Sequence, residues 1–311
     1  SDVCSSDLYE VSCERARERE MERMRLLFDF KPESSVGDLH PSYRSARGAD
    51  TRVQHHHAHV LSVMAEHGLQ GGILGIAFDG TGYAADGTIW GSEFLICEGK
   101  KFWKKGSLSP VLLPGGDQGA RNASLSLTGY LWAAGEMVAP ESKAALSAEI
   151  GTIRSSSMGR LFDAAAALLQ ICSENTYEGQ CAAELEIAAG KAAAPYPLSL
   201  PVRKEGERYF GDGPALIREM KLALDDGAEV SALALGFHAA VSRFTVELAE
   251  RIVREEGLSR VALSGGSFVN RLLLKGIIPA LRDAHLTVFW NEKVPCGDGG
   301  LALGQIYYDV L

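Results

Sequence analysis

Apolar residues recur along much of the chain at the spacing of one helix face, and elsewhere they gather in short continuous runs. The helical spacing predicts helices over residues 9–28, 53–67, 121–135, 140–150, 157–172, 181–192, 229–256 and 267–282, with a last helix from Gly299. The short runs predict strands over residues 72–79, 88–97, 261–264 and 286–290. Strand and helix alternate towards the C-terminal end, which is typical of a layered α/β domain.

Proline and glycine indicate where these elements end. Pro32 follows the first predicted helix, and Gly68 follows the second, where glycine tolerates the left-handed cap conformation. The glycines over 80–87 predict a tight turn, so the first two strands should form a hairpin. Residues 195–226 mix proline, glycine and charge, and we expect a surface excursion there.

The chain divides into four predicted segments. Residues 1–8 have no apolar period and no signal-peptide pattern; they resemble a translated sequencing adapter, and we expect a non-native tail rather than an ordinary disordered terminus. Residues 9–50 should form a helix and a connector, and 51–120 the remainder of a first lobe. A change to long helical periods near 118–125 predicts a second lobe over 121–311.

Composition and charge narrow the function classes. The 311 residues are 46% apolar and 23% charged, enough for one large domain or two lobes. The 31 Lys and Arg against 40 Asp and Glu give a net charge of −9, so we expect no nucleic-acid partner. Apolar runs stay far below the roughly 20 residues that span a bilayer, so we expect no membrane partner. The 6 cysteines include no C-x-x-C pair, which favours a cytoplasmic location without disulfides or a cysteine zinc site.

Four histidines lie within five residues at the start of the second predicted helix. His55 and His59 are one helical turn apart, so both side chains leave the same helix face. This pair is half of a metal site, which carboxylates from other elements would complete. A solvated polar face is the alternative, but Asp79 ends the next predicted strand and favours the metal.

Glycine-rich turns follow three predicted strands. The segments are 78–83 (Phe-Asp-Gly-Thr-Gly-Tyr), 263–270 (Leu-Ser-Gly-Gly-Ser-Phe-Val-Asn) and 295–300 (Pro-Cys-Gly-Asp-Gly-Gly). Backbone N–H groups at such turns and helix entrances can bind phosphate oxygens. Glycine also occurs in hairpin and strand-to-helix turns only because it adopts the backbone conformation they need. Each turn by itself is therefore compatible with phosphate binding and with a purely structural role. If residues 264–266 approach a ligand, Gly265→Val should block binding and leave the lobe folded.

Nine motifs in fixed order carry a family resemblance. They are Leu39-His-Pro, Val53-Gln-His-His-His-Ala-His, Phe78-Asp-Gly-Thr-Gly-Tyr, Gly87-Thr-Ile-Trp-Gly, Leu113-Pro-Gly-Gly-Asp, Gly159-Arg-Leu-Phe-Asp, Thr176-Tyr-Glu-Gly-Gln, Leu263-Ser-Gly-Gly and Asp298-Gly-Gly-Leu-Ala-Leu-Gly-Gln. Over residues 36–311 the chain resembles the C-terminal, Kae1-like domain of HypF-type carbamoyltransferases. That domain is similar to the tRNA threonylcarbamoyltransferases.

The resemblance implies a fold, an activity and a set of site residues. The fold is α/β, the two-lobed actin/sugar-kinase/Hsp70-like (ASKHA) ATPase fold. The activity is carbamoyl transfer from carbamoyl-adenylate to the C-terminal cysteine of a HypE-type acceptor protein, towards the cyanide ligand of [NiFe]-hydrogenase. His55, His59, Asp79 and Asp298 would hold a divalent metal (Fe, Zn or Mg), with Asp79 and Asp298 catalytic. ATP or carbamoyl-adenylate would contact Gly80, Thr81, Gly82, Asp163, Gly179, Gln180, Glu184, Gly265, Gly266 and Asn270.

Departures from the family leave alternatives open. The family's acylphosphatase-like, zinc-finger and adenylate-forming domains are not in the sequence, and the first phosphate loop of the ATPase lobe is missing. We therefore expect an N-terminally truncated chain with an incomplete first lobe, which does not make carbamoyl-adenylate itself. The alternatives are a carbamoyltransferase acting on small molecules or tRNA, and a catalytically silent fragment that docks a partner.

Overall fold

The structure, a computed structural model, describes residues 11–29, 31–41 and 43–311. The predicted tail of residues 1–8 lies outside them. The helices are α2 (Val11–Phe28), α3 (His55–Glu66), α4 (Ala123–Ala133), α5 (Pro140–Ala148), α6 (Met158–Leu168), α7 (Gln180–Ala189), α8 (Gly213–Asp225), α9 (Val230–Glu256), α10 (Arg271–Asp283) and α11 (Leu301–Val310). The strands are β1 (Val36–Asp38), β2 (Thr51–Val53), β3 (Ile73–Tyr83), β4 (Ile89–Glu98), β5 (Lys101–Leu108), β6 (Val111–Pro114), β7 (Thr152–Ser155), β8 (Val202–Glu205), β9 (Arg208–Gly211), β10 (Arg260–Ser264) and β11 (Thr287–Trp290).

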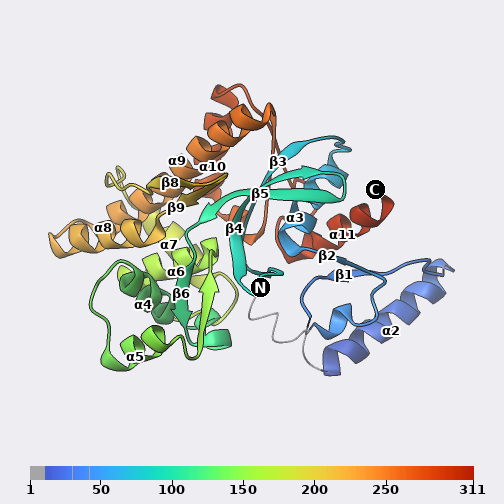
Figure 1. Ribbon diagram of the computed structural model, residues 1–311, viewed down its shortest axis with the longest axis horizontal. Helices are drawn as coiled ribbons and strands as arrows, with labels where there is room; N and C mark the ends of the chain where they lie inside the picture. The colour runs from blue at the N-terminus through green and yellow to red at the C-terminus, as the bar shows by residue number, and fades with distance from the viewer. Residues whose placement is uncertain (1–10, 30, 42) are drawn as a thin grey trace.

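One large mixed sheet runs through the molecule. Its main path has the order β11-β10-β3-β4-β5-β9-β8, and β6 and β7 branch from β4. β3 pairs in parallel with β10 and antiparallel with β4. The late strand β10 therefore lies beside β3, with β11 on its far side, and α11 packs along α3 (Figure 1). The sheet thus crosses the boundary drawn from the sequence near 118–125, and the division into lobes stays a prediction.

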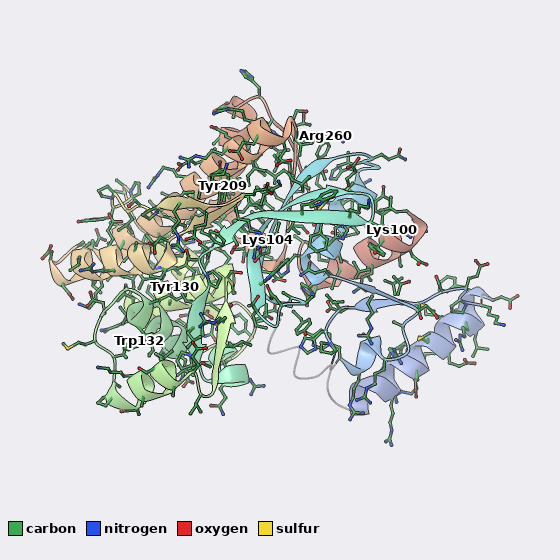
Figure 2. All side chains as sticks on the ribbon, in the orientation of Figure 1. Lys100, Lys104, Tyr130, Trp132, Tyr209 and Arg260 are labelled. Carbon is green, nitrogen blue, oxygen red and sulfur yellow. A yellow bond between two sulfur atoms is a disulfide. The ribbon has the colours of Figure 1, made fainter. Side chains whose placement is uncertain are left out.

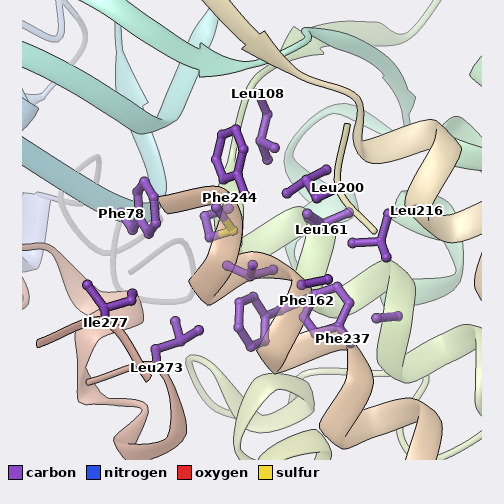
Figure 3. Packing of buried hydrophobic residues seen from close by; sticks show 14 of the residues in the cluster. Phe78, Leu108, Leu161, Phe162, Leu200, Leu216, Phe237, Phe244, Leu273 and Ile277 are labelled. Atoms are coloured by element: carbon purple, nitrogen blue, oxygen red, sulfur yellow. The ribbon is translucent and has the colours of Figure 1, made fainter. Parts of the chain in front are cut away.

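The two faces of β3 enter two different cores. Ile73 and Ala77 pack with α3 in one apolar cluster, while Ile76 and Phe78 belong to a larger cluster with α6, α9 and α10. Figure 3 shows part of the larger cluster, with Phe78 among residues of several helices. Because side chains alternate along a strand, Asp79 shares the α3 face with Ile73 and Ala77. The alternation therefore turns the Asp79 carboxylate towards His55 and His59 on α3.

The α/β class is confirmed, and most of the predicted helices are present within a few residues of their predicted ends. Two local predictions are wrong. The predicted hairpin of β3 and β4 is confirmed, but its turn begins later than predicted: residues 80–83 continue β3, where Gly82 and Tyr83 pair with β4 after a register shift. Residues 195–226 are not a surface excursion: they form β8, β9 and α8, whose Leu216 and Ile217 are fully buried.

The expectation of no disulfide is also wrong. Cys172 and Cys181 form a disulfide with a Cα to Cα distance of 5.1 Å. They lie nine positions apart, without the C-x-x-C spacing, and come together because the chain turns back between α6 and α7. Cys97 and Cys296 are free. No helix in the described ranges combines the length and the apolar character that crossing a membrane requires.

Candidate metal and nucleotide site

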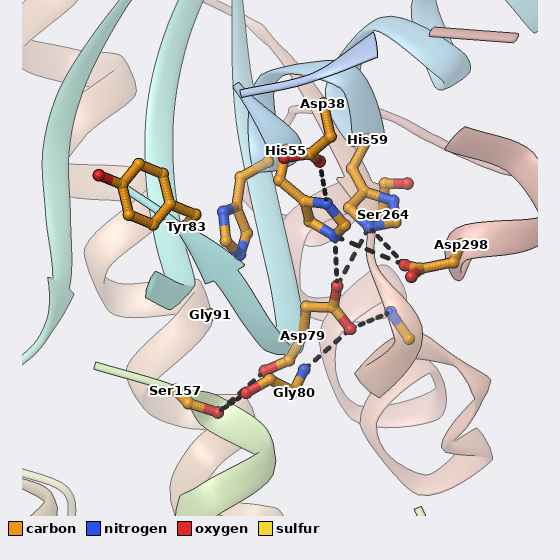
Figure 4. A network of polar contacts seen from close by, with 12 residues as sticks. Asp38, His55, His59, Asp79, Gly80, Tyr83, Gly91, Ser157, Ser264 and Asp298 are labelled. Atoms are coloured by element: carbon orange, nitrogen blue, oxygen red, sulfur yellow. Dashed lines mark hydrogen bonds and ion pairs between the residues drawn. The ribbon is translucent and has the colours of Figure 1, made fainter. Parts of the chain in front are cut away.

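Four predicted ligands converge at the end of the large sheet (Figure 4). His55 Nε2 and His59 Nε2 each lie 3.1 Å from Asp79 Oδ2. Asp298 Oδ1 lies 3.4 Å from His55 Nε2 and 3.6 Å from His59 Nε2. One ligand atom from each residue lies within 4.8 Å of every other. The arrangement is a compact set of two imidazoles and two carboxylates.

The local sequence explains how each ligand is placed. His55 and His59 share one face of α3, and Gln54 caps this helix by accepting a hydrogen bond from the backbone N–H of His57. Asp79 faces them by the alternation of β3. Asp298 begins the short 3₁₀ turn Asp298–Gly300 that leads into α11, which packs along α3. The ligands therefore come from three segments that only the tertiary fold brings together.

Asp38 is a further member of this network that the sequence analysis missed. Its Oδ2 accepts a hydrogen bond from His55 Nδ1 at 2.8 Å, and its Oδ1 accepts one from the backbone N–H of His40, also at 2.8 Å. A proton on Nδ1 leaves His55 Nε2 free as a ligand atom. The residue stands next to the Leu39-His-Pro motif, so its position in the sequence could have drawn attention to it.

Imidazoles and carboxylates shift one another's pKa values inside the cluster. Burial lowers the pKa of His55, but hydrogen bonds to Asp298, Asp38 and Asp79 more than offset this and hold that pKa well above its ordinary value. The pKa of His59 is raised in the same way, against burial, by Asp298 and Asp79. Burial raises the pKa of Asp79, yet the two imidazoles hold it well below its usual range. In the absence of a metal, the neighbouring carboxylates thus favour the protonated form of both imidazoles.

The donor set fits a divalent metal ion. Two ligand atoms that are each about 2.1 Å from one ion lie about 3.0 to 3.4 Å apart at octahedral or tetrahedral angles. The nitrogen to oxygen distances of 3.1 to 3.6 Å lie within this spacing or slightly above it. Nitrogen and oxygen donors of this kind can hold a divalent metal ion. A divalent metal would replace the two Nε2 protons, so the net charge of the site would not change.

The turn after β10 lies directly against Asp79. Gly266 N donates to Asp79 Oδ1 at 3.3 Å, and Gly80 N donates to the same oxygen at 2.8 Å. Gly265 has a φ of +101°, and a Cβ there would lie 2.2 Å from the carbonyl oxygen of Phe78. The expectation that Gly265→Val leaves the lobe folded is therefore wrong, because the side chain would collide with the β3 backbone.

The other predicted nucleotide contacts lie around α6, α7 and the start of α10. Asp163 is buried on α6, where its carboxylate pairs with Arg160 and accepts from Asn175. Gly179 caps α7 in the left-handed conformation. Gln180 accepts from Thr176 and donates to Glu184 at 2.8 Å.

Asn270 caps α10 by accepting from Leu273 N, and its amide nitrogen contacts His238. The N-terminal end of α6 connects these residues to the cluster, since Ser157 Oγ donates to the carbonyls of Asp79 and Gly80. Thr81 and Gly82 lie on β3 beyond Asp79. Gly80 and Gly266 donate directly to Asp79, and Gly82 lies against the ring of His55.

Comparisons with known proteins agree with one another. Residues 75–305 match the family model described as carbamoyltransferase, Kae1-like domain, second subdomain, and residues 4–66 match that of the HypF Kae1-like domain. The second match begins inside the segment expected to be a non-native tail. The carbamoyltransferase HypF of Rhizobium leguminosarum is 37% identical over 91% of this chain and 38% of its own length. A carbamoyltransferase HypF homologue of Cupriavidus necator is 35% identical over 87% of this chain and 76% of its own.

Solved structures give the same result. Full-length HypF in its phosphate- and nucleotide-bound form superposes with a TM-score of 0.86 at 37% identity, over 94% of this chain and 48% of that one. HypF of T. kodakarensis superposes with a TM-score of 0.78 at 32% identity, over 88% and 40%. The chain spans about two fifths of the length of the first curated relatives that it matches.

Proposed function

The chain belongs to the HypF-type carbamoyltransferase family, as its Kae1-like domain, and on this premise we propose that it passes a carbamoyl group from carbamoyl-adenylate to a protein thiol. The acceptor would be the C-terminal cysteine of a HypE-type partner in the cytoplasm, on the route to the cyanide ligand of [NiFe]-hydrogenase. One observation carries the proposal: His55, His59, Asp79 and Asp298 form a metal-ligand set beside a glycine turn.

The chemistry of the transfer requires a site of this kind. The thiolate sulfur attacks the carbamoyl carbon, the bond from that carbon to the phosphate oxygen breaks, and AMP leaves while the thiol proton goes to solvent. Negative charge develops on the carbamoyl oxygen and on the phosphate. A divalent metal held by the four side chains would stabilise this charge as a Lewis acid.

The chain's own groups would orient the donor. The backbone N–H groups of Gly80 and Gly266 already converge on Asp79, so the β3 and β10 ends form a polar rim around the carboxylate. We propose that a phosphate lies along this rim, with Gly265, Thr81 and Gly82 beside it. Full-length HypF, a relative, has a phosphate- and nucleotide-bound form, which supports nucleotide binding in this family.

We propose that the nucleoside lies towards α6, α7 and α10. Asp163, Gly179, Gln180, Glu184 and Asn270 are the candidate contacts there. Gln180 and Glu184 are already joined by a hydrogen bond, which would hold both polar groups in place for a ribose or base. The net charge of −9 disfavours tRNA as the acceptor, unless a partner supplies the basic surface.

The proposal is tested with supplied carbamoyl-adenylate, purified HypE and the chain as it exists. We expect AMP release together with a mass increase of one carbamoyl group on the HypE C-terminal cysteine. Asp298→Asn keeps the side-chain size but removes a ligand charge, and should reduce transfer by about a hundredfold or more while the chain stays folded. Asp226→Asn, at an exposed helix end, is the matched control.

Other outcomes would decide for the alternatives. Transfer to tRNA or a small molecule but not to HypE would show that the proposed acceptor is wrong. Binding of HypE by a metal-loaded, folded chain that transfers nothing would indicate a docking fragment.

A further inference from the structure

His56 lies between the two histidine ligands in the sequence but is not one of them. It is fully buried. Its ring centroid lies 5.4 Å from that of His55 and 6.5 Å from that of His59, with Trp90 on the other side at 6.2 Å. The ring therefore flanks the candidate metal ligands, and its hydrogen-bond partner is Gln54 rather than one of the carboxylates.

The hydrogen bonds of Gln54 determine which nitrogen of His56 carries the proton. Gln54 Oε1 accepts a hydrogen bond from the backbone N–H of His57 at 2.9 Å. The amide nitrogen of Gln54 therefore points away from His57 N and towards the ring of His56. That nitrogen lies 3.2 Å from His56 Nδ1 and also donates to the Tyr83 carbonyl at 3.4 Å. Nδ1 must therefore be the acceptor, and the proton of His56 resides on Nε2.

This Nε2–H has no hydrogen-bond acceptor among the described residues. A buried N–H donor without a partner costs about 1–3 kcal/mol, so such groups are rare unless a ligand or ordered water satisfies them. Neighbouring groups do not supply the acceptor. Lys104, labelled on β5 in Figure 2, lies over Trp90 and is itself a donor, and Glu93 is paired with Lys104 at 2.6 Å.

The chain makes room for His56 at this place. A Cβ on Gly82 would lie 2.3 Å from His56 Cε1 and 3.1 Å from His55 Cδ2. Only glycine at position 82 therefore allows the ring to lie against β3 beside the cluster. A substitution by alanine would push the ring away from its place.

We propose that the Nε2–H of His56 is a donor for an oxygen atom of the ligand at the metal site, a carbonyl or phosphoryl oxygen of carbamoyl-adenylate. The inference rests on the proposed function for the identity of that ligand. In this proposal His56 contacts the bound molecule, whereas His55 binds the metal. His56 would then bind the oxygen on which negative charge develops.

Two variants separate the donor from the bulk of the ring. His56→Gln retains an N–H donor near the position of Nε2, while His56→Asn retains a polar group near Nδ1 for Gln54 but loses the distal donor. We expect His56→Asn to weaken binding of a non-hydrolysable carbamoyl-adenylate analogue about tenfold, and His56→Gln to recover most of the loss. Metal content should stay at the wild-type level in both, as measured by elemental analysis.

Nuclear magnetic resonance of the chain with ¹⁵N-labelled histidine gives a readout that does not depend on activity. We expect the His56 signals of the Nε2–H tautomer, and a shift of that proton when metal and the analogue, AMP or inorganic phosphate are added. Unchanged affinity in a folded His56→Asn chain, or a proton that none of these probes moves, would overturn the inference and leave an ordered water as the partner.

The two proposals fail in different ways. Carbamoyl transfer to HypE that is equal in wild type and His56→Asn would refute the His56 contact alone. Absence of transfer in wild type, with the Nε2–H proton still shifted by AMP or phosphate, would refute the acceptor chemistry and retain the contact.

Discussion

Replacing Asp38 by asparagine should weaken metal binding although Asp38 is not a ligand. Two N–H donors face its carboxylate: the backbone of His40 contacts Oδ1 and the Nδ1 of His55 contacts Oδ2, each at 2.8 Å. Asparagine has one acceptor oxygen, so its NH₂ group must face one of the two donors. The imidazole can relieve this clash by moving its proton to Nε2, which removes the lone pair that the metal needs.

The size of the effect follows from the role of such supporting carboxylates. Their loss typically reduces metal affinity by about 10- to 100-fold, or about 1.4 to 2.7 kcal/mol. We expect the upper end, because Asp38 is buried and its hydrogen bond to His55 is charge-assisted. Competition with a chelating dye for Fe(II) or Zn(II) at about pH 8 measures the dissociation constant, and thermal unfolding checks the fold.

Asp86→Asn is the matched control variant. Asp86 is exposed and accepts from Thr88 N at 3.0 Å and from Thr88 Oγ1 at 2.6 Å, both through Oδ1. Asp86→Asn keeps that oxygen, so metal affinity should not change. A metal affinity in folded Asp38→Asn within about threefold of wild type would refute the reasoning about the His55 proton.

Three further predictions concern the same region. The chain should bind about one divalent metal, and His55→Ala/His59→Ala should lose it in elemental analysis; full retention would exclude the site as described. The pKa of His55 is held above 6.5, so its contribution to the stability of the metal-free chain should be fully present below about pH 6.5 and be lost as pH rises through the raised pKa. Metal affinity should increase over the same range, because the metal competes with the proton. Thermal melting and metal titration from about pH 6 to about pH 9 measure the two trends, and a metal affinity that does not rise with pH would contradict the prediction. Gly265→Val should destabilise the fold by about 3 kcal/mol or more in urea unfolding, since its Cβ meets the Phe78 carbonyl; a wild-type midpoint would show that the turn can move.

Features that depend on near neighbours could be predicted from the sequence. The helical spacing of apolar residues located α3, α6, α7 and α9, because a helix buries one face whatever it packs against. The separation of His55 and His59 by one turn placed both on one face for the same reason. The glycine run after Asp79 was misjudged, since pairing with β4 extends the strand through residues that favour a turn in isolation.

The remaining features were decided by tertiary structure. Asp38, Asp79 and Asp298 meet His55 only because β1, β3 and the turn before α11 pack around one end of α3, and no local pattern encodes that meeting. The Cys172–Cys181 disulfide depends likewise on the chain turning back between two helices. From the sequence, the shared helix face of His55 and His59 followed from their spacing, and most other candidate site residues followed from the family resemblance, whereas Asp38 did not. Long-range strand pairing and burial determined which of these groups touch, because those energies depend on residues far apart in the chain.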